Sequence, residues 1–132
     1  MTKWTARFVV LCGFLVATVS VSTHHSLAGV YALGKEAKVT GTFKAFRIVN
    51  PHSSLRIEAK GSDGKLVEWA IVGGSVQAIS RLGLKEGPNA LKVGDEITVT
   101  MVPALDGKSP VGLLIAITYP DGQTLRFRDP DQ

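Results

Sequence analysis

The chain has 132 residues, 45% of them hydrophobic, and its 15 Lys and Arg outnumber its 11 Asp and Glu, giving a formal net charge of +4. This length suits one domain with one core. The only cysteine is Cys12, near the start. The rest of the chain therefore excludes a disulfide scaffold, cysteine-based zinc sites and thiol catalysis.

The beginning of the chain has the layout of a secretory signal peptide. Lys3 and Arg7 precede an apolar run over residues 8–21, and small residues follow. Cleavage after Ser22 and cleavage after Thr23 both fit the preference for small residues. The run of about 14 apolar residues is shorter than the roughly 20 that span a bilayer. We therefore expect export to the periplasm, with no membrane span in the mature protein.

Removing residues 1–23 leaves a single domain over residues 24–132. Loss of Lys3 and Arg7 from the 15 Lys and Arg leaves 13 against 11 Asp and Glu, a net charge of about +2. Charges of both signs are interleaved without a basic stripe, so nucleic-acid binding is not expected. We expect a monomer held by core packing, with a short N-terminal leader and a polar C-terminal tail.

Residues 38–49 are rich in β-branched and aromatic side chains and predict the first strand. Alternation places Val39, Gly41, Phe43 and Ala45 on one face. A glycine inside a strand indicates a bulge or a tight bend, here at Gly41.

Two further strands follow and form a predicted hairpin. Asn50-Pro51 ends the first strand, and residues 55–59 alternate between apolar and charged side chains. Residues 62–65 read Ser-Asp-Gly-Lys, which is typical of a hairpin turn. The chain then returns along residues 66–72, where Val, Trp and Ile alternate with Glu and Ala.

A short helix is expected over residues 75–82, with Ser75 as its N-cap and Gly83 ending it. Residues 96–103 alternate again and predict a fourth strand. A nearly continuous apolar stretch, residues 111–119, predicts a strand buried on both faces. A last short strand is expected over residues 124–128.

Three strands, a helix and two strands, with a sixth strand appended, match the order of an OB-fold-like antiparallel barrel. The alternative is an open β-sandwich. Barrel closure would hide the sheet edges of a domain that has no disulfide. The predicted core consists of Val39, Phe43, Leu55, Ile57, Val67, Trp69, Ile71, Ile79, Leu82, Ile97, Val99, Leu114 and Ile117.

Nine short motifs in fixed order resemble those of a group of small exported bacterial proteins catalogued as a domain of unknown function. They span nearly the whole mature chain, and that group implies a compartment and a fold but no activity. Val76 departs from the pattern, because the family often has Pro there, and residues 47–49 replace a segment that often carries Trp. The motifs are His24-His25-Ser26, Asn50-Pro51-His52, Glu68-Trp69, Gly74-Ser75, Arg81-x-Gly83, Gly94-Asp95, Pro103-x-x-Asp106-Gly107, Gly112-Leu113-Leu114 and Asp121-Gly122.

The three histidines, His24, His25 and His52, suggest a nitrogen-rich metal site. Imidazole is the commonest metal ligand, and cleavage would add a free N-terminal amine beside two of them. Amine and imidazole nitrogens suit Cu(II), so a copper carrier or a copper redox enzyme is the alternative function. The other interpretation of His24 and His25 is a solvated leader with no ligand.

A second candidate site is the barrel surface near Trp69 and the β-turn at Asn50 and His52, with Glu68 beside them. Barrels of this type bind ligands across their second and third strands. The sequence shows no serine nucleophile elbow, HExxH motif, P-loop or dinucleotide fingerprint, which favours a non-catalytic role. The leading prediction is therefore an exported module that binds a small molecule or an envelope protein.

Overall fold

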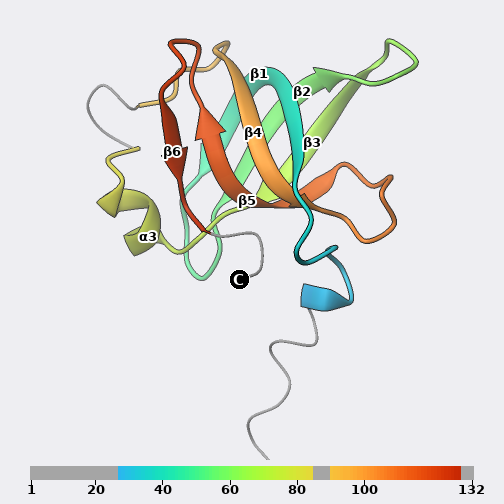
Figure 1. The fold of residues 1–132 in the computed structure, drawn as a ribbon. Helices are drawn as coiled ribbons and strands as arrows, with labels where there is room; N and C mark the ends of the chain where they lie inside the picture. The colour runs from blue at the N-terminus through green and yellow to red at the C-terminus, as the bar shows by residue number, and fades with distance from the viewer. Residues whose placement is uncertain (1–26, 85–89, 129–132) are drawn as a thin grey trace, which may run out of the picture.

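The computed structural model describes residues 27–84 and 90–128 of the chain (Figure 1). This part contains six strands and one short helix, α3, and it starts with a helical segment at residues 27–28. Their bounds are β1 (Ala37–Arg47), β2 (Ser54–Lys60), β3 (Leu66–Val72), α3 (Val76–Arg81), β4 (Glu96–Pro103), β5 (Val111–Thr118) and β6 (Thr124–Arg126). The predicted order of elements is confirmed, and the bounds agree within one or two residues at most strand ends.

The sheet closes into a barrel. Its strand order is β3-β2-β1-β4-β5-β6, and an additional pairing joins β3 to β5. This closing pairing is parallel and covers three residue pairs, Ala70–Val72 against Val111–Leu113. The other strand pairs of the barrel are antiparallel, as expected from the sequence. One parallel pair is needed because strand direction cannot alternate around a closed ring of five strands. The five-stranded barrel with a helix between β3 and β4 is the OB-fold arrangement.

Strand β1 contains a bulge that the alternation pattern did not locate. The pairing with β2 shifts register between Phe43 and Ala45, which leaves Lys44 as the extra residue. Beyond the bulge, Ala45 is exposed and Phe46 turns inward. The prediction that Ala45 shares the inner face is therefore wrong, because one inserted residue reverses every later side chain on the strand.

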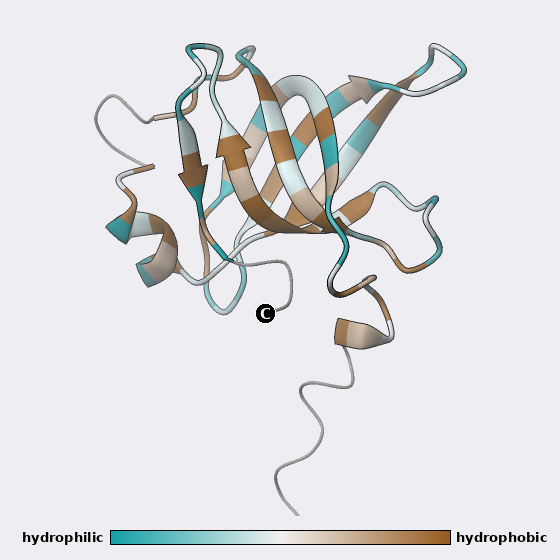
Figure 2. Cartoon of the chain, viewed as in Figure 1, coloured by the Kyte–Doolittle hydropathy of each residue, from teal (hydrophilic) through white to brown (hydrophobic). Residues whose placement is uncertain are grey.

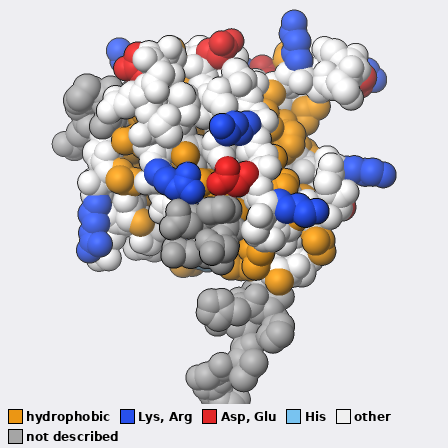
Figure 3. Space-filling view, viewed as in Figure 1, with side chains coloured by type: hydrophobic (Ala, Val, Ile, Leu, Met, Phe, Trp, Pro, Cys, Tyr) orange, Lys and Arg blue, Asp and Glu red, His pale blue; other side chains and the backbone are white. Residues whose placement is uncertain are grey.

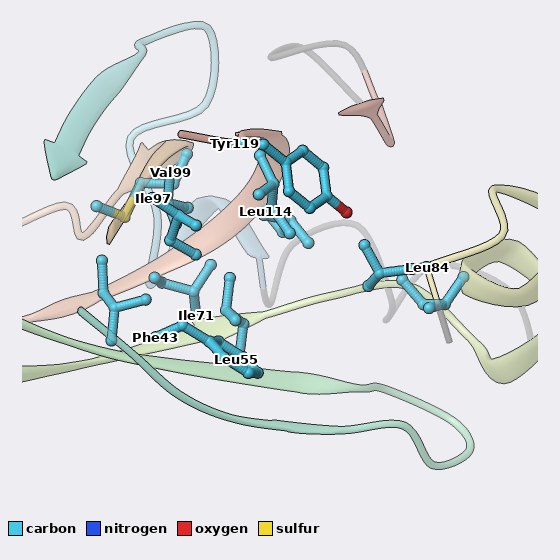
Figure 4. Packing of buried hydrophobic residues seen from close by; sticks show 12 residues of the cluster. Phe43, Leu55, Ile71, Leu84, Ile97, Val99, Leu114 and Tyr119 are labelled. Carbon is cyan, nitrogen blue, oxygen red and sulfur yellow. The ribbon is translucent and has the colours of Figure 1, made fainter. Parts of the chain in front are cut away.

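The main core fills the barrel (Figure 4). Nine of the thirteen predicted core residues are buried in it. The residues that the prediction missed are Leu84, Met101 and Tyr119, which belong to the same cluster. The nine predicted residues that are buried are Phe43, Leu55, Ile57, Ile71, Ile79, Ile97, Val99, Leu114 and Ile117.

Four predicted core residues are only half-buried: Val39, Val67, Trp69 and Leu82. Leu82 is the C-cap of the helix, where the chain already turns away. The other three point inward but line a cleft at the edge of the barrel. Correct alternation thus placed them on the inner face, but their depth depends on how far the strands diverge.

Helix α3 forms as the sequence predicts. The Ser75 hydroxyl accepts a hydrogen bond from the Ala78 amide at 3.4 Å, and Gly83 follows the last turn with φ of 69°. Only Ile79 of the helix is fully buried, and it joins the main core. The helix lies beside the barrel near β6 and the β1–β2 loop in Figure 1.

A second, smaller apolar cluster explains why β5 is buried on both faces. Leu27 and Tyr31 pack against the outward side chains of β4 and β5, so the start of the described chain covers that face. Tyr31 also forms a β-bridge with Ala104. Figure 2 shows β5 as a largely apolar strand, whereas apolar and paler segments alternate along much of β4. The buried members are Val102, Leu113, Ile115 and Ala116.

Tyr119 makes the free energy of unfolding depend on pH in the alkaline range. Its ring is 8% exposed, and burial, together with Asp121 and Asp95, raises the pKa from 10.0 to about 12. Because the folded state disfavours ionisation, the contribution of Tyr119 to stability is complete below pH 10 and is lost as pH rises toward 12. We expect Tyr119→Phe to flatten the fall in unfolding free energy over this range, measured by urea titration at several pH values. Parallel pH profiles for the two proteins would contradict this.

Candidate functional site

A cleft that includes the predicted site residue Trp69 lies at one mouth of the barrel. Strand β1 pairs with β2 only from Thr42 onward, whereas its first half, Ala37–Gly41, pairs with β4 alone. The strands β1 and β2 therefore diverge, and a cleft of about 490 Å³ opens between them. The β2–β3 hairpin and the β4–β5 loop border it, and Figure 3 shows apolar surface exposed between these two segments.

Gly41 sits at the point of divergence. A Cβ atom on this residue would lie 2.6 Å from the Glu58 carbonyl oxygen and 3.1 Å from the Ala59 Cβ. Only glycine allows the two backbones to approach this closely before they separate. The predicted bend at Gly41 is thus a close approach of two strands, and the bulge lies farther along.

The inner wall of the cleft is apolar and aromatic. Val39, Ala59, Val67 and Trp69 contribute to it from three different strands. Trp69 lies opposite Ile57 in the β2–β3 pairing and packs against the main core while remaining half-buried. A partly exposed indole in a concave site offers a flat surface for a ligand.

The rim of the cleft is basic. Lys38, Lys60 and Lys108 line it from β1, the end of β2 and the β4–β5 loop. Among the residues that line the cleft there is no Asp or Glu, and the remaining polar groups are two hydroxyls, Thr40 and Ser62, the indole N–H of Trp69, and backbone. The site combines an apolar wall with positive charge.

Asp106 orders the loop that carries Lys108. Its Oδ1 accepts hydrogen bonds from the Lys108 and Ser109 amides, both at 2.9 Å, and its Oδ2 accepts one from the Ser109 hydroxyl at 2.5 Å. These bonds, led by the Ser109 hydroxyl, lower the pKa of Asp106 to about 2. The carboxylate is therefore ionised at neutral pH and committed to the loop.

Glu68, a predicted ligand-binding residue, lies on the other face of β3 from Trp69. Its Oε1 is 3.3 Å from Arg56 Nη1, and both side chains are more than half exposed. A second pair, Lys44 and Glu58 at 2.9 Å, lies on the same outer face. The structure therefore does not bring Glu68 to the Trp69 cleft.

Asn50 and His52 lie in the β1–β2 loop, at the opposite end of β2 from the cleft. The Asn50 Oδ1 accepts a hydrogen bond from the Val76 amide at 3.2 Å, so Asn50 ties this loop to the start of helix α3. His52 is exposed beside Ser53, whose amide donates to the Gly74 carbonyl at 3.0 Å. The structure thus gives Asn50 a structural contact and places both residues away from Trp69.

The copper prediction falls mainly on residues outside the described part of the chain, where His24 and His25 lie. Within residues 27–84 and 90–128, no group of three His, Cys, Asp or Glu side chains could hold a metal ion. In Figure 1 the β1–β2 loop, which carries His52, lies apart from the blue helical segment at the start of the described chain. The N-terminal copper chelate stays a prediction, and no contact among the described residues supports His52 as one of its ligands.

Sequence reasoning missed the three cleft lysines. They lie 22 and 48 residues apart along the chain, in segments that otherwise look like ordinary solvated strand ends and turns. The one usable signal was that Lys60 precedes the predicted hairpin turn at residues 62–65, while Lys108 lies between the strands predicted over residues 96–103 and 111–119. Because charges of both signs alternate along the sequence, the sequence alone did not predict this basic rim.

Together these features define a small OB-type barrel with an aromatic cleft bordered by lysines. The chain belongs to the family of unknown function DUF6152, whose model matches residues 13–113. This confirms the resemblance to a family of unknown function. The comparison with curated proteins gave no match. Among the described residues, no helix is long and apolar enough to cross a membrane.

The solved structures that match this chain include the mitochondrial single-stranded DNA-binding protein Rim1 of S. cerevisiae, with 13% identity and a TM-score of 0.46. The match covers 71% of this chain and 97% of Rim1.

Proposed function

We propose that this protein is an exported, non-catalytic module that binds a small molecule in the cleft around Trp69. The cleft itself carries the proposal, since it is concave, has an apolar wall and presents a few polar groups at its rim. Its volume of about 490 Å³ falls within the roughly 300–1,000 Å³ common for small-molecule sites. The basic start and the apolar run of the sequence support export.

The chemistry of the lining supports binding over catalysis. Its hydroxyl groups, Thr40 and Ser62, have no histidine or carboxylate beside them among the residues of the cleft. A serine or threonine nucleophile needs such a base within hydrogen-bond reach. Neutral, unactivated hydroxyls serve instead as hydrogen-bond donors and acceptors to a bound molecule.

Trp69 makes the proposal directly measurable. The chain has two tryptophans, and Trp4 lies in the predicted signal peptide, so Trp69 is the only one in the mature protein. We expect a ligand in the cleft to change its fluorescence. We also expect Trp69→Ala to weaken binding about 2–10-fold by calorimetry, from the roughly 0.5–1.5 kcal/mol of an aromatic contact.

The matched control is Trp69→Phe, which keeps a flat ring on the same strand and should retain more affinity than the alanine variant. Unchanged binding in both variants would contradict the assignment of the cleft.

Intact-mass analysis of the exported protein should give Thr23 or His24 as its first residue. Full-length protein in the cytoplasm would contradict export.

A further inference from the structure

We propose that the ligand of the Trp69 cleft is a small anion with a flat apolar body, such as an aromatic carboxylate, sulfonate or phosphate. This rests on the proposed function and specifies the ligand class. The observation behind it is the convergence of Lys38, Lys60 and Lys108 on the rim of a cleft whose wall contains Trp69.

The positive charge at this rim is not neutralised by ion pairs within the described chain. The four salt bridges found there involve other cations, namely Lys44, Arg56, Lys65 and Arg126. Each of these lysines has a carboxylate two residues away in the sequence, and each carboxylate has another partner. Glu36 lies 3.7 Å from Arg126, Glu58 lies 2.9 Å from Lys44, and Asp106 accepts three hydrogen bonds from its own loop. Asp106 also interacts with the charge of Lys108, but none of the three lysines forms an ion pair within the described residues.

The wall of the cleft determines the rest of the ligand. Val39, Ala59 and Val67 are apolar, and Trp69 adds a half-buried ring. A molecule that placed only charge here would leave this surface in contact with water. One that also carried a flat apolar group would cover it and gain the burial energy of that area.

A polyanion fits less well. Long nucleic acids are usually bound along a continuous basic surface, whereas these lysines border one bounded cleft. On the outer face of the same strands, Lys44 and Arg56 are paired with Glu58 and Glu68. The charge pattern therefore favours a compact anion over an extended one.

Two matched dyes test the charge requirement on the mature protein. The probe 8-anilinonaphthalene-1-sulfonate and the neutral N-phenyl-1-naphthylamine share one aromatic frame and differ by a sulfonate. We expect the sulfonate dye to bind at least about fivefold more tightly at low salt, and this preference to shrink as salt screens the lysines. Equal affinities for the two dyes would overturn the proposal.

Single variants identify the charges that matter. Lys60→Gln and Lys108→Gln should each weaken the anionic dye about 2–5-fold, the range for exposed charge pairs, and the double variant roughly tenfold. Lys92→Gln is the matched control, because Lys92 lies in the exposed turn before β4, at the far end of that strand from the cleft. None of these variants, single or double, should change binding of the neutral dye or the melting temperature. Equal weakening by Lys92→Gln would overturn the proposal.

The outcomes separate this inference from the proposed function. If both dyes bind equally well and Trp69→Ala weakens both, the cleft binds ligands but the anion requirement is wrong. If neither dye binds, or Trp69→Ala changes neither, the binding function itself fails. A thymidine oligonucleotide that displaces the anionic dye at lower concentration than naphthalene-1-sulfonate would also overturn the small-anion assignment.

Discussion

Replacing Ile57 by Ala is expected to lower the free energy of unfolding by about 2–5 kcal/mol. Ile57 is fully buried in β2, between Phe43 of β1 and Trp69 of β3 in the sheet. Neighbouring strands cannot collapse into the space without breaking their ladder of hydrogen bonds, so a cavity would remain. The loss is a large share of the roughly 5–15 kcal/mol that stabilises a domain. Urea unfolding, followed by fluorescence of Trp69, measures it.

A surface leucine in the next strand is the control. Leu66 in β3 is 62% exposed, and its replacement by Ala should change the unfolding free energy by no more than about 0.5 kcal/mol. The chain has a single cysteine, Cys12, so no intrachain disulfide supports the barrel. A loss below about 1 kcal/mol for Ile57→Ala would mean that the barrel interior is more loosely packed than the structure shows.

Gly41→Ala is the second substitution with a large expected effect. The added Cβ would meet the Glu58 carbonyl oxygen at 2.6 Å and its carbon at 3.0 Å. These are backbone atoms of β2, so the strand must shift, and we expect a loss of about 1–3 kcal/mol in unfolding free energy. Because Gly41 lies where β1 leaves β2, the shift should also reshape the Trp69 cleft and reduce ligand affinity.

Gly73→Ala is the matched control for that substitution. A Cβ on Gly73 would have its nearest neighbours, in Ser53 and Leu114, at 3.5–3.6 Å, which is ordinary contact. The backbone there is not left-handed, so alanine can adopt it, and the unfolding free energy should change by no more than about 1 kcal/mol. If Gly73→Ala proved the more damaging of the two, the close approach at Gly41 would not be the limiting contact.

Local patterns in the sequence were enough to predict the strands and the helix. Alternation along residues 66–72 and 96–103 gave the bounds of β3 and β4, because a strand with one buried face repeats every two residues. Gly64 and Gly83, both with positive φ, marked the hairpin and the end of the helix. The helix between the third and fourth strands then selected the OB-type order. These features are local, so the chain reveals them without its partners.

The burial of individual side chains and the register between strands were harder to predict. The bulge at Lys44 has no distinctive residue type, and it reversed the side of the sheet that Ala45 occupies. Val67 and Trp69 face inward as expected, yet the divergence of β1 from β2 leaves them half-buried. Pattern predicts which way a side chain points, whereas neighbouring strands decide how much covers it.

The candidate site was decided by the tertiary structure. The sequence singled out Trp69, which lines the cleft, but it grouped this residue with Glu68, Asn50 and His52, which the barrel places on another face or at another end. The charges that do surround it come from three segments distant in sequence. The sequence around an exposed lysine does not indicate which distant residues will lie beside it. The basic rim forms because strand coiling and the β3–β5 closure bring those segments to one mouth of the barrel.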